Sequence, residues 1–166
     1  MAPPVLRLGA PPLVSAAALS ELQCGAYAAA APAAGRGWSA EAVASAIDDP
    51  ASLWAEAFAG PGAAAPLIGF ALARSVLDEA ELLAMARDPA QKGRGLGAML
   101  LEALLSAAQS NGARSMFLEV GVGNAPARAL YERFAFEAVG RRVGYYHDGF
   151  GRRQDALLMR KWLMAT

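Results

Sequence analysis

Hydrophobic and polar positions alternate along the middle of the chain with a period of two residues. The segment 52–60, SLWAEAFAG, places Leu53 and Ala55 on one face and Trp54 and Glu56 on the other. That period is typical of a β-strand, whose successive side chains point to opposite faces. The segments predicted to be strands are 3–10, 52–60, 67–78, 79–88, 114–122, 137–149 and 153–163. We expect the second and third of them to pair as an antiparallel hairpin.

Apolar positions at helical spacing appear mainly in the second half of the chain. In GAMLLEALLSAAQSNG the apolar residues recur every three or four positions, and Asn111-Gly112 marks the end of the helix. Ser39 and Asn124 are plausible caps of two other helices, and Pro126 suits a first helical turn. The segments predicted to be helices are 12–31, 38–49, 97–112 and 124–136.

The order of these elements favours one α/β domain over residues 1–166. Strands come first, a strand–helix–strand–helix unit follows, and a hairpin closes the chain. The Ala/Gly/Pro patches at 28–37 and 60–66 are interpreted as loops, not linkers. We find no internal repeat that would indicate a second unit.

Charge and composition narrow the possible partners. Acidic and basic residues balance at 15 each, so a neutral chain gives no argument for binding nucleic acid or an anionic membrane. The two GRR clusters, at 140–142 and 151–153, are interpreted as solvated surface. Cys24 is the only cysteine, which excludes an internal disulfide, suits a cytoplasmic protein and favours a buried structural thiol. The sequence contains neither a secretion signal nor an apolar run long enough for a transmembrane helix.

A glycine-rich turn, GRGLGA at 93–98, precedes the helix at 97–112. Glycines permit tight turns and let a ligand approach the backbone closely. The first N–H groups of a helix have no partner within it and lie at the positive end of the helix dipole. Together with Lys92 and Arg94 they predict an anion site, most simply for phosphate. The alternative is a turn that only connects a strand to a helix.

Two interpretations of a phosphate site compete. GRGLGA fits the dinucleotide fingerprint G-x-G-x-x-G/A, and Glu119 lies where a ribose-binding acid belongs. However, RDPAQK separates the first glycine from its strand, and too little chain follows for a doubly wound sheet. A Walker phosphate loop is excluded because no G-K-[ST] is present.

The other interpretation is an acyl-CoA site. The stretch RDPAQKGRGLGAMLLEALL resembles the R/Q-x-x-G-x-G/A loop of the GNAT N-acetyltransferase superfamily, with Lys92 in the Arg or Gln position. The block FLEVGVGNAPARALYERFAFEAVGRRVGYY, followed by DALLMRK, resembles the RimI-type branch of ribosomal-protein alanine N-terminal acetyltransferases. The resemblance implies the GNAT fold: a mostly antiparallel mixed sheet of about six or seven strands and about four helices, splayed between the fourth and fifth strands.

The resemblance also implies roles for particular residues. Glu119 would be the general base and Tyr131 the general acid. The implied acetyl-CoA-binding residues are Met85, Ala86, Lys92, Gly93, Arg94, Gly95, Leu96, Gly97, Asn124 and Tyr131. Tyr145 and Tyr146 could line the acceptor groove or only pack the closing hairpin. No metal is implied.

The implied reaction moves an acetyl group from acetyl-CoA to an amine, most simply a protein N-terminal α-amino group of the ribosomal protein S18 alanine type. An α-amino group has a pKa of about 7.7–8.0, so it must lose a proton before attack. A carboxylate can accept that proton, and a phenol can protonate the departing thiolate. The alternatives are a small amine or a lysine as acceptor, or a binding module without catalysis. A monomer and a homodimer are both compatible with the sequence.

Each of these residues also has a purely structural interpretation. Glu119 could be an ordinary strand carboxylate, Tyr131 a core residue and Asn124 only a helix cap. The chain departs from the branch pattern as well. Gly121 replaces an arginine, and Ala135 replaces a glycine that commonly adopts a left-handed conformation. The usual ending of the helix at 124–136 is therefore not assured.

Overall fold

The predicted elements are found in the computed structural model, which describes residues 3–9, 12–29, 38–62, 64–147 and 152–163. The strands are β1 (Val5–Gly9), β2 (Ser52–Phe58), β3 (Leu67–Val76), β4 (Glu79–Arg87), β5 (Ser115–Gly121), β6 (Glu137–His147) and β7 (Arg153–Trp162). The α-helices are α1 (Ala16–Ala29), α2 (Ala40–Asp48), α3 (Leu96–Ser110) and α4 (Ala125–Arg133). A short 3-10 turn, η2 (Pro89–Gln91), follows β4. None of the described helices is long and apolar enough to cross a membrane.

Two predicted helix boundaries were wrong. The helix expected over 12–31 begins only at Ala16. The Ser15 side chain caps it by accepting a hydrogen bond from the N–H of Ala18, and the N–H groups of Leu13 and Val14 before it donate to the buried carboxylate of Glu56. The helix expected over 124–136 ends at Arg133. Residues 30–31 and 148–149, at the ends of two predicted elements, lie outside the described residues.

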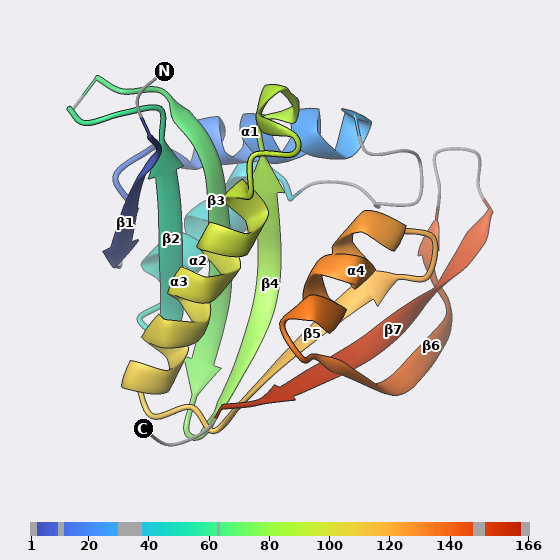
Figure 1. The fold of residues 1–166 in the computed structure, drawn as a ribbon. Helices are drawn as coiled ribbons and strands as arrows, with labels where there is room; N and C mark the ends of the chain where they lie inside the picture. Colours follow the sequence, from blue (N-terminus) through green and yellow to red (C-terminus); the bar gives the residue numbers. More distant parts are fainter. Residues whose placement is uncertain (1–2, 10–11, 30–37, 63, 148–151, 164–166) are drawn as a thin grey trace.

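Seven described strands form one mixed sheet in the order β1-β2-β3-β4-β5-β7-β6 (Figure 1). Neighbouring strands are antiparallel except for β4 and β5, which are parallel and joined through α3. This is the mixed, mostly antiparallel sheet implied by the resemblance. The doubly wound parallel sheet required by the dinucleotide interpretation does not form among these strands.

Helices cover both faces of the sheet, so β2 and β3 are buried on both sides (Figure 1). On the α3 face, Leu100, Leu104 and Met116 belong to one core. On the α1–α2 face, a second core is built around Trp54 and Phe70. The alternation predicted for 52–60 is therefore correct, and both of its faces are used.

Cys24 was expected to be a buried thiol, but it lies on the exposed side of α1. Leu19 and Gln23, four residues apart, face inward and are fully buried. Cys24 lies one position further along the helix and is exposed. The Gln23 side chain instead accepts a hydrogen bond of 2.8 Å from the backbone N–H of Trp38, which ties the start of α2 to α1.

A β-bulge in β4 opens the sheet between β4 and β5. Leu72 of β3 pairs with Ala84 while Ala73 pairs with Leu82, so Leu83 is the extra residue of the bulge. Pairing between β4 and β5 also ends at this point, with Leu82 opposite Leu118. Beyond it the strands diverge, as Figure 1 shows. The predicted splay between the fourth and fifth strands is confirmed, and the bulge is its physical cause.

The end of α4 keeps a left-handed residue although no glycine is present. Ala135 has a φ of 62°. Its N–H donates to the carbonyl of Glu132, and the N–H of Phe136 donates to the carbonyl of Tyr131. These two bonds form a Schellman motif. The turn therefore has the usual geometry at the cost of steric strain, which for an L-residue is about 1–2 kcal/mol.

This strain predicts that Ala135→Gly stabilises the protein. Glycine removes the steric penalty but increases the entropy of the unfolded chain, so we expect a net gain of about 0.5–1 kcal/mol in the free energy of unfolding. Urea denaturation measures it. Ala129→Gly is the matched control, because Ala129 lies exposed inside the same helix, where glycine costs about 0.5–1 kcal/mol. A loss of stability in Ala135→Gly would contradict the assignment of strain.

Candidate active site

A cavity of about 140 Å³ lies where β4 and β5 diverge. This is roughly the volume of four or five water molecules in the liquid, enough for a small reacting group but not for a whole nucleotide. Its lining comes from β4, β5, α4 and β6: Leu82, Leu83, Ala84, Met85, Glu119, Val120, Gly121, Asn124, Ala127, Tyr131 and Tyr146. The structure thus brings together five of the residues singled out from sequence: Met85, Glu119, Asn124, Tyr131 and Tyr146.

Glu119 reaches the cavity from the face of β5 turned away from the α3 core. Its neighbours Leu118 and Val120 are buried in that core, so alternation directs Glu119 to the opposite face. Tyr131 comes to the same cavity from α4, where it packs in the α3 core. The site is therefore lined from both faces of the splayed sheet.

The Glu119 carboxylate has an ion-pair partner that sequence reasoning missed. The Nε of Arg142 on β6 lies 2.8 Å from Glu119 Oε1. The Glu119 side chain is 15% exposed and the Arg142 side chain 57%. Arg142 belongs to the first GRR cluster, which was interpreted as solvated surface; its side chain is exposed, but it also pairs with Glu119. Strand pairing could not be deduced from spacing, so the sequence offered no sign of the contact.

Tyr145 is the second partner of Glu119. Its hydroxyl donates a hydrogen bond to the carboxylate, and the charge of Glu119 together with this bond raises the pKa of the phenol. The Arg142 guanidinium lies 5.1 Å from the centre of the Tyr145 ring. Tyr145 and Tyr146 meet edge to face, with ring centroids 5.1 Å apart. The tyrosine pair therefore lies beside Glu119 at the mouth of the cavity.

Tyr131 is held by the turn that ends α4. Only 8% of the residue is exposed, and its ring meets that of Phe136 edge to face at 5.9 Å. Phe136 is the residue whose N–H closes the Schellman motif on Tyr131. The strained turn and the aromatic contact together fix the position of this phenol at the cavity.

Asn124 both caps α4 and lines the cavity. Its side-chain oxygen accepts a hydrogen bond of 3.3 Å from the N–H of Ala127. The loop before it is fastened by Arg128, whose Nη1 donates to the carbonyl of Val122 at 3.1 Å. The two interpretations left open for Asn124, cap and site residue, are thus geometrically compatible.

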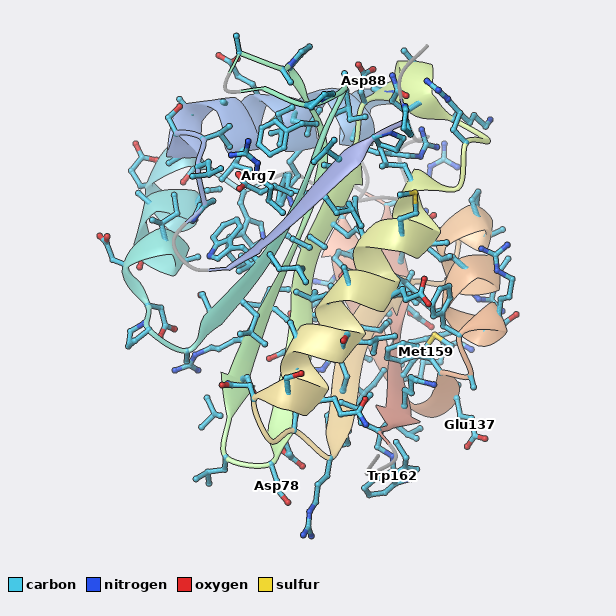
Figure 2. All side chains as sticks on the ribbon, turned by 60° about the vertical axis from the view of Figure 1, so that its left-hand side comes forward. Arg7, Asp78, Asp88, Glu137, Met159 and Trp162 are labelled. Carbon is cyan, nitrogen blue, oxygen red and sulfur yellow. The ribbon has the colours of Figure 1, made fainter. Side chains whose placement is uncertain are left out.

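The glycine turn lies at the end of β4, beyond the bulge. Gly93 and Gly95 have φ values of 79° and 74°, and a Cβ at either position would meet open space. Gly95 is the N-cap of α3, with no side-chain capping bond. Lys92 and Arg94 are exposed beside it. Asp88, which precedes this turn, lies at the opposite end of the sheet from Asp78 and Trp162 (Figure 2).

The predicted cofactor residues fall into two groups around β4. Lys92, Gly93, Arg94 and Gly95 are exposed on the turn, while Leu96 is buried and Gly97 partly buried where α3 begins. Met85 lines the cavity, but the Ala86 side chain belongs to the α1–α2 core. Ala86 can therefore offer only backbone groups to a ligand.

The β6–β7 hairpin is shaped by Asp155. Its carboxylate accepts a hydrogen bond of 2.8 Å from the N–H of Gly144 and pairs with Arg141, whose Nη2 lies 2.5 Å away. These contacts, led by the Gly144 bond, lower the pKa of Asp155. Gly144 has a φ of 61°, in the stretch where the pairing register between the two strands shifts. The irregular segment between Arg142 and Tyr146 presents the tyrosine pair to Glu119.

The fold and site are those of an acyltransferase-like protein. The mixed sheet is splayed, a glycine turn lies at the end of β4, and the carboxylate of Glu119 and the phenol of Tyr131 meet where the strands diverge. The sequence matches the Acetyltransferase (GNAT) family over residues 19–136, and the chain belongs to this family. The family resemblance stated from the motifs is thereby confirmed.

Particular relatives match this chain in sequence and in structure. The [ribosomal protein bS18]-alanine N-acetyltransferase of Salmonella typhimurium is 42% identical over 93 residues, which are 56% of this chain and 62% of that protein. The chain thus spans less than two thirds of the length of this curated relative. The crystal structure of the ribosomal-protein-S18-alanine N-acetyltransferase from Escherichia coli superposes with a TM-score of 0.81 at 29% identity, covering 98% of this chain and 97% of that one.

A more distant structure shares the fold alone. The crystal structure of Arabidopsis thaliana NAA60 in complex with acetyl-CoA has a TM-score of 0.76 at 20% identity, covering 97% of this chain and 99% of that one.

Proposed function

We propose that this protein transfers an acetyl group from acetyl-CoA to an amine. The observation that carries the proposal is the cavity at the bulge of β4, where a carboxylate from one face of the sheet and a phenol from the other meet a strand edge free of its neighbour. The reaction needs a proton acceptor for the amine and a proton donor for the thiolate, and this cavity offers one group of each kind. Membership of the GNAT family supports the same reaction.

Acetyl-CoA would lie along the edge of β4. Its pyrophosphate would meet the N–H groups at the start of α3, with Lys92 and Arg94 supplying positive charge. The open space over Gly93 and Gly95 suits the close approach that a diphosphate requires. Because the cavity is too small for a nucleotide, only the thioester end would enter it. Backbone groups of β4 beyond Leu82, where its pairing with β5 ends, would bond the pantetheine arm and the acetyl carbonyl.

Glu119 and Tyr131 would perform the two proton transfers. Glu119 would take a proton from the acceptor ammonium, directly or through water, so that the neutral amine attacks the thioester carbonyl. The tetrahedral intermediate would lose the second nitrogen proton to water and collapse, expelling the thiolate. Tyr131 would protonate the sulfur and recover its own proton from water. Because side chains reach the cavity from both sheet faces, the amine and the thioester would approach from opposite sides, and positioning would supply much of the rate.

The acceptor is proposed to be the N-terminal α-amino group of a protein, of the ribosomal protein bS18 alanine type. Two features support it: the names of the relatives that match over the site-bearing half of the chain, and the tyrosine pair beside Glu119, of which Tyr145 is exposed and available to a peptide. Gly121 leaves the cavity wall without a side chain at the position where the branch carries an arginine. A small amine or a lysine side chain is the alternative acceptor.

Gly95→Ala should weaken acetyl-CoA binding about tenfold or more, a loss of roughly 1.4 kcal/mol or more. The methyl group would strain a residue with positive φ and occupy the space proposed for the diphosphate. Isothermal titration calorimetry with acetyl-CoA measures the change.

A control separates ligand contact from backbone strain. Gly112→Ala introduces similar strain at the far end of α3, where φ is 92°, and should leave binding intact. Equal losses in Gly95→Ala and Gly112→Ala would refute the diphosphate site.

Glu119→Gln and Tyr131→Phe should each slow acetyl transfer by about 10²–10⁴-fold while preserving acetyl-CoA binding. Each change removes one proton-transfer group with little change in shape. Single-turnover rates and calorimetry separate chemistry from binding. Glu132→Gln, an exposed carboxylate next to Tyr131 on α4, is the control and should retain parental rates. Parental turnover in both test variants would show that the acid–base assignment is wrong.

A peptide panel tests the acceptor. Peptides that begin with alanine, each with a free or a blocked N-terminus, are compared with internal-lysine peptides and small amines by mass spectrometry. We expect acetylation of the free α-amino group and none of the blocked peptides. Preferential acetylation of lysine or of a small amine would redirect the acceptor assignment but keep the acetyltransferase. Acetyl-CoA binding without transfer to any amine would favour a binding module.

A further inference from the structure

Arg142 forms an ion pair with Glu119, the carboxylate to which an acceptor ammonium is expected to bind. Its Nε lies 2.8 Å from Glu119 Oε1, at the mouth of a cavity that otherwise presents Tyr131, Tyr146 and Met85. The contact spans the sheet, because β7 lies between β5 and β6. A guanidinium from the edge strand β6 thus pairs with Glu119, the proposed base.

Small residues beneath the Arg142 side chain allow it to contact Glu119 across β7. Ala156 of β7 pairs with Arg142 on one side and with Gly121 on the other. Directly paired residues point to the same face of a sheet, and Glu119, two positions from Gly121, points to that face as well. The Arg142 side chain can therefore cross over a methyl group and a glycine to reach the carboxylate.

The charges around Glu119 explain why a cation rests there. Arg142 and Tyr145 contact it from β6, Tyr131 shares its cavity from α4, and Glu81 of β4 adds a negative charge that acts on Tyr145. Arg142 thus contacts one carboxylate, Glu119, in a group that also contains the negative charge of Glu81. A positive charge at this place is stabilised whether the protein or a ligand supplies it.

The guanidinium and an acceptor ammonium exclude each other at this site. Both are cations that would contact one carboxylate, and like charges at such a distance repel. Arg142 is free to leave, since its side chain is 57% exposed and it stands on an edge strand with solvent beyond.

We propose that Arg142 is a displaceable counter-ion: it neutralises Glu119 while the acceptor site is empty and is replaced there by the ammonium group of the acceptor. The inference rests on the proposed function and narrows the acceptor to amines that arrive as cations. Arg142 is a positioning residue in this scheme and takes no part in the transfer of the acetyl group. Arg142 therefore competes with the acceptor for Glu119.

Removing this competitor should strengthen acceptor binding. With an alanine-initiated peptide, Arg142→Gln should lower KM about two- to fivefold, the range set by the strength of exposed ion pairs, with kcat within about twofold of the parent. Arg142→Lys restores a cation and should return KM toward the parental value. Arg141→Gln is the matched control, because Arg141 neighbours Arg142 on β6 but pairs with Asp155, and its KM should not fall.

A binding measurement isolates the charge of the acceptor. With coenzyme A present, calorimetry compares the same peptide with its Nα-acetyl form, which carries no ammonium. Arg142→Gln should strengthen binding of the free peptide two- to fivefold and leave the acetylated peptide unchanged. A higher or unchanged KM in Arg142→Gln, equal effects on both peptides, or the same fall in KM in Arg141→Gln would overturn the proposal.

The outcomes also separate this inference from the proposed function. A parent protein that acetylates the peptide while Arg142→Gln fails to lower KM overturns the counter-ion alone. A parent that binds no acetyl-CoA and acetylates no amine overturns the function and, with it, this inference. Circular dichroism and melting temperature verify that the variants fold. If Arg142→Gln does not fold, Arg142→Met replaces it, because it also removes the cation and keeps an unbranched side chain. An unchanged KM in that variant would overturn the proposal.

Discussion

The loss of pairing between β4 and β5 beyond Leu82 is the constraint on which the rest of the structure depends. A parallel pair buried between helices would normally continue along both strands, because unpaired backbone groups are costly when buried. Here the bulge at Leu83 turns β4 aside, and the edge that it exposes has no strand partner. Those backbone groups are available to a ligand, and the cavity lies where they become free. The fold thereby loses strand hydrogen bonds at this edge, and an extended ligand can replace them.

The walls of the cavity are held more firmly than its opening. Tyr131 is fixed by a Schellman motif and by the ring of Phe136, and Asn124 by its bond to Ala127. An alanine in a left-handed conformation is tolerated at Ala135 because the surrounding bonds over-determine the turn. Glu119, by contrast, is held by exposed groups on an edge strand. The part of the site proposed to meet the leaving group is rigid, and the part proposed to meet the incoming amine can rearrange.

The sequence predicted the elements well where periodicity was strong and poorly where tertiary contacts decided. Alternation over 52–60 and helical spacing over 97–112 correspond to β2 and α3. The start of α1 was misplaced because Ser15 caps the helix, while Glu56, more than forty residues away, binds the N–H groups of the segment before it. The end of α4 was misplaced because backbone bonds, not residue type, impose the turn at Ala135. The bulge was missed because two adjacent leucines, Leu82 and Leu83, do not reveal in sequence which of them leaves the ladder.

The same distinction applies to the site. The resemblance to the GNAT motifs singled out Glu119 and Tyr131, which the fold then brings to one cavity from opposite faces of the sheet. The contact of Arg142 depends on register across three strands, which places Ala156 and Gly121 in one row beneath its side chain. The glycine that departs from the branch pattern and the arginine that was interpreted as surface are thus connected. The branch carries an arginine two positions after the acidic residue of β5, where this chain has Gly121. The guanidinium of Arg142 from β6 extends over this glycine to the carboxylate of Glu119.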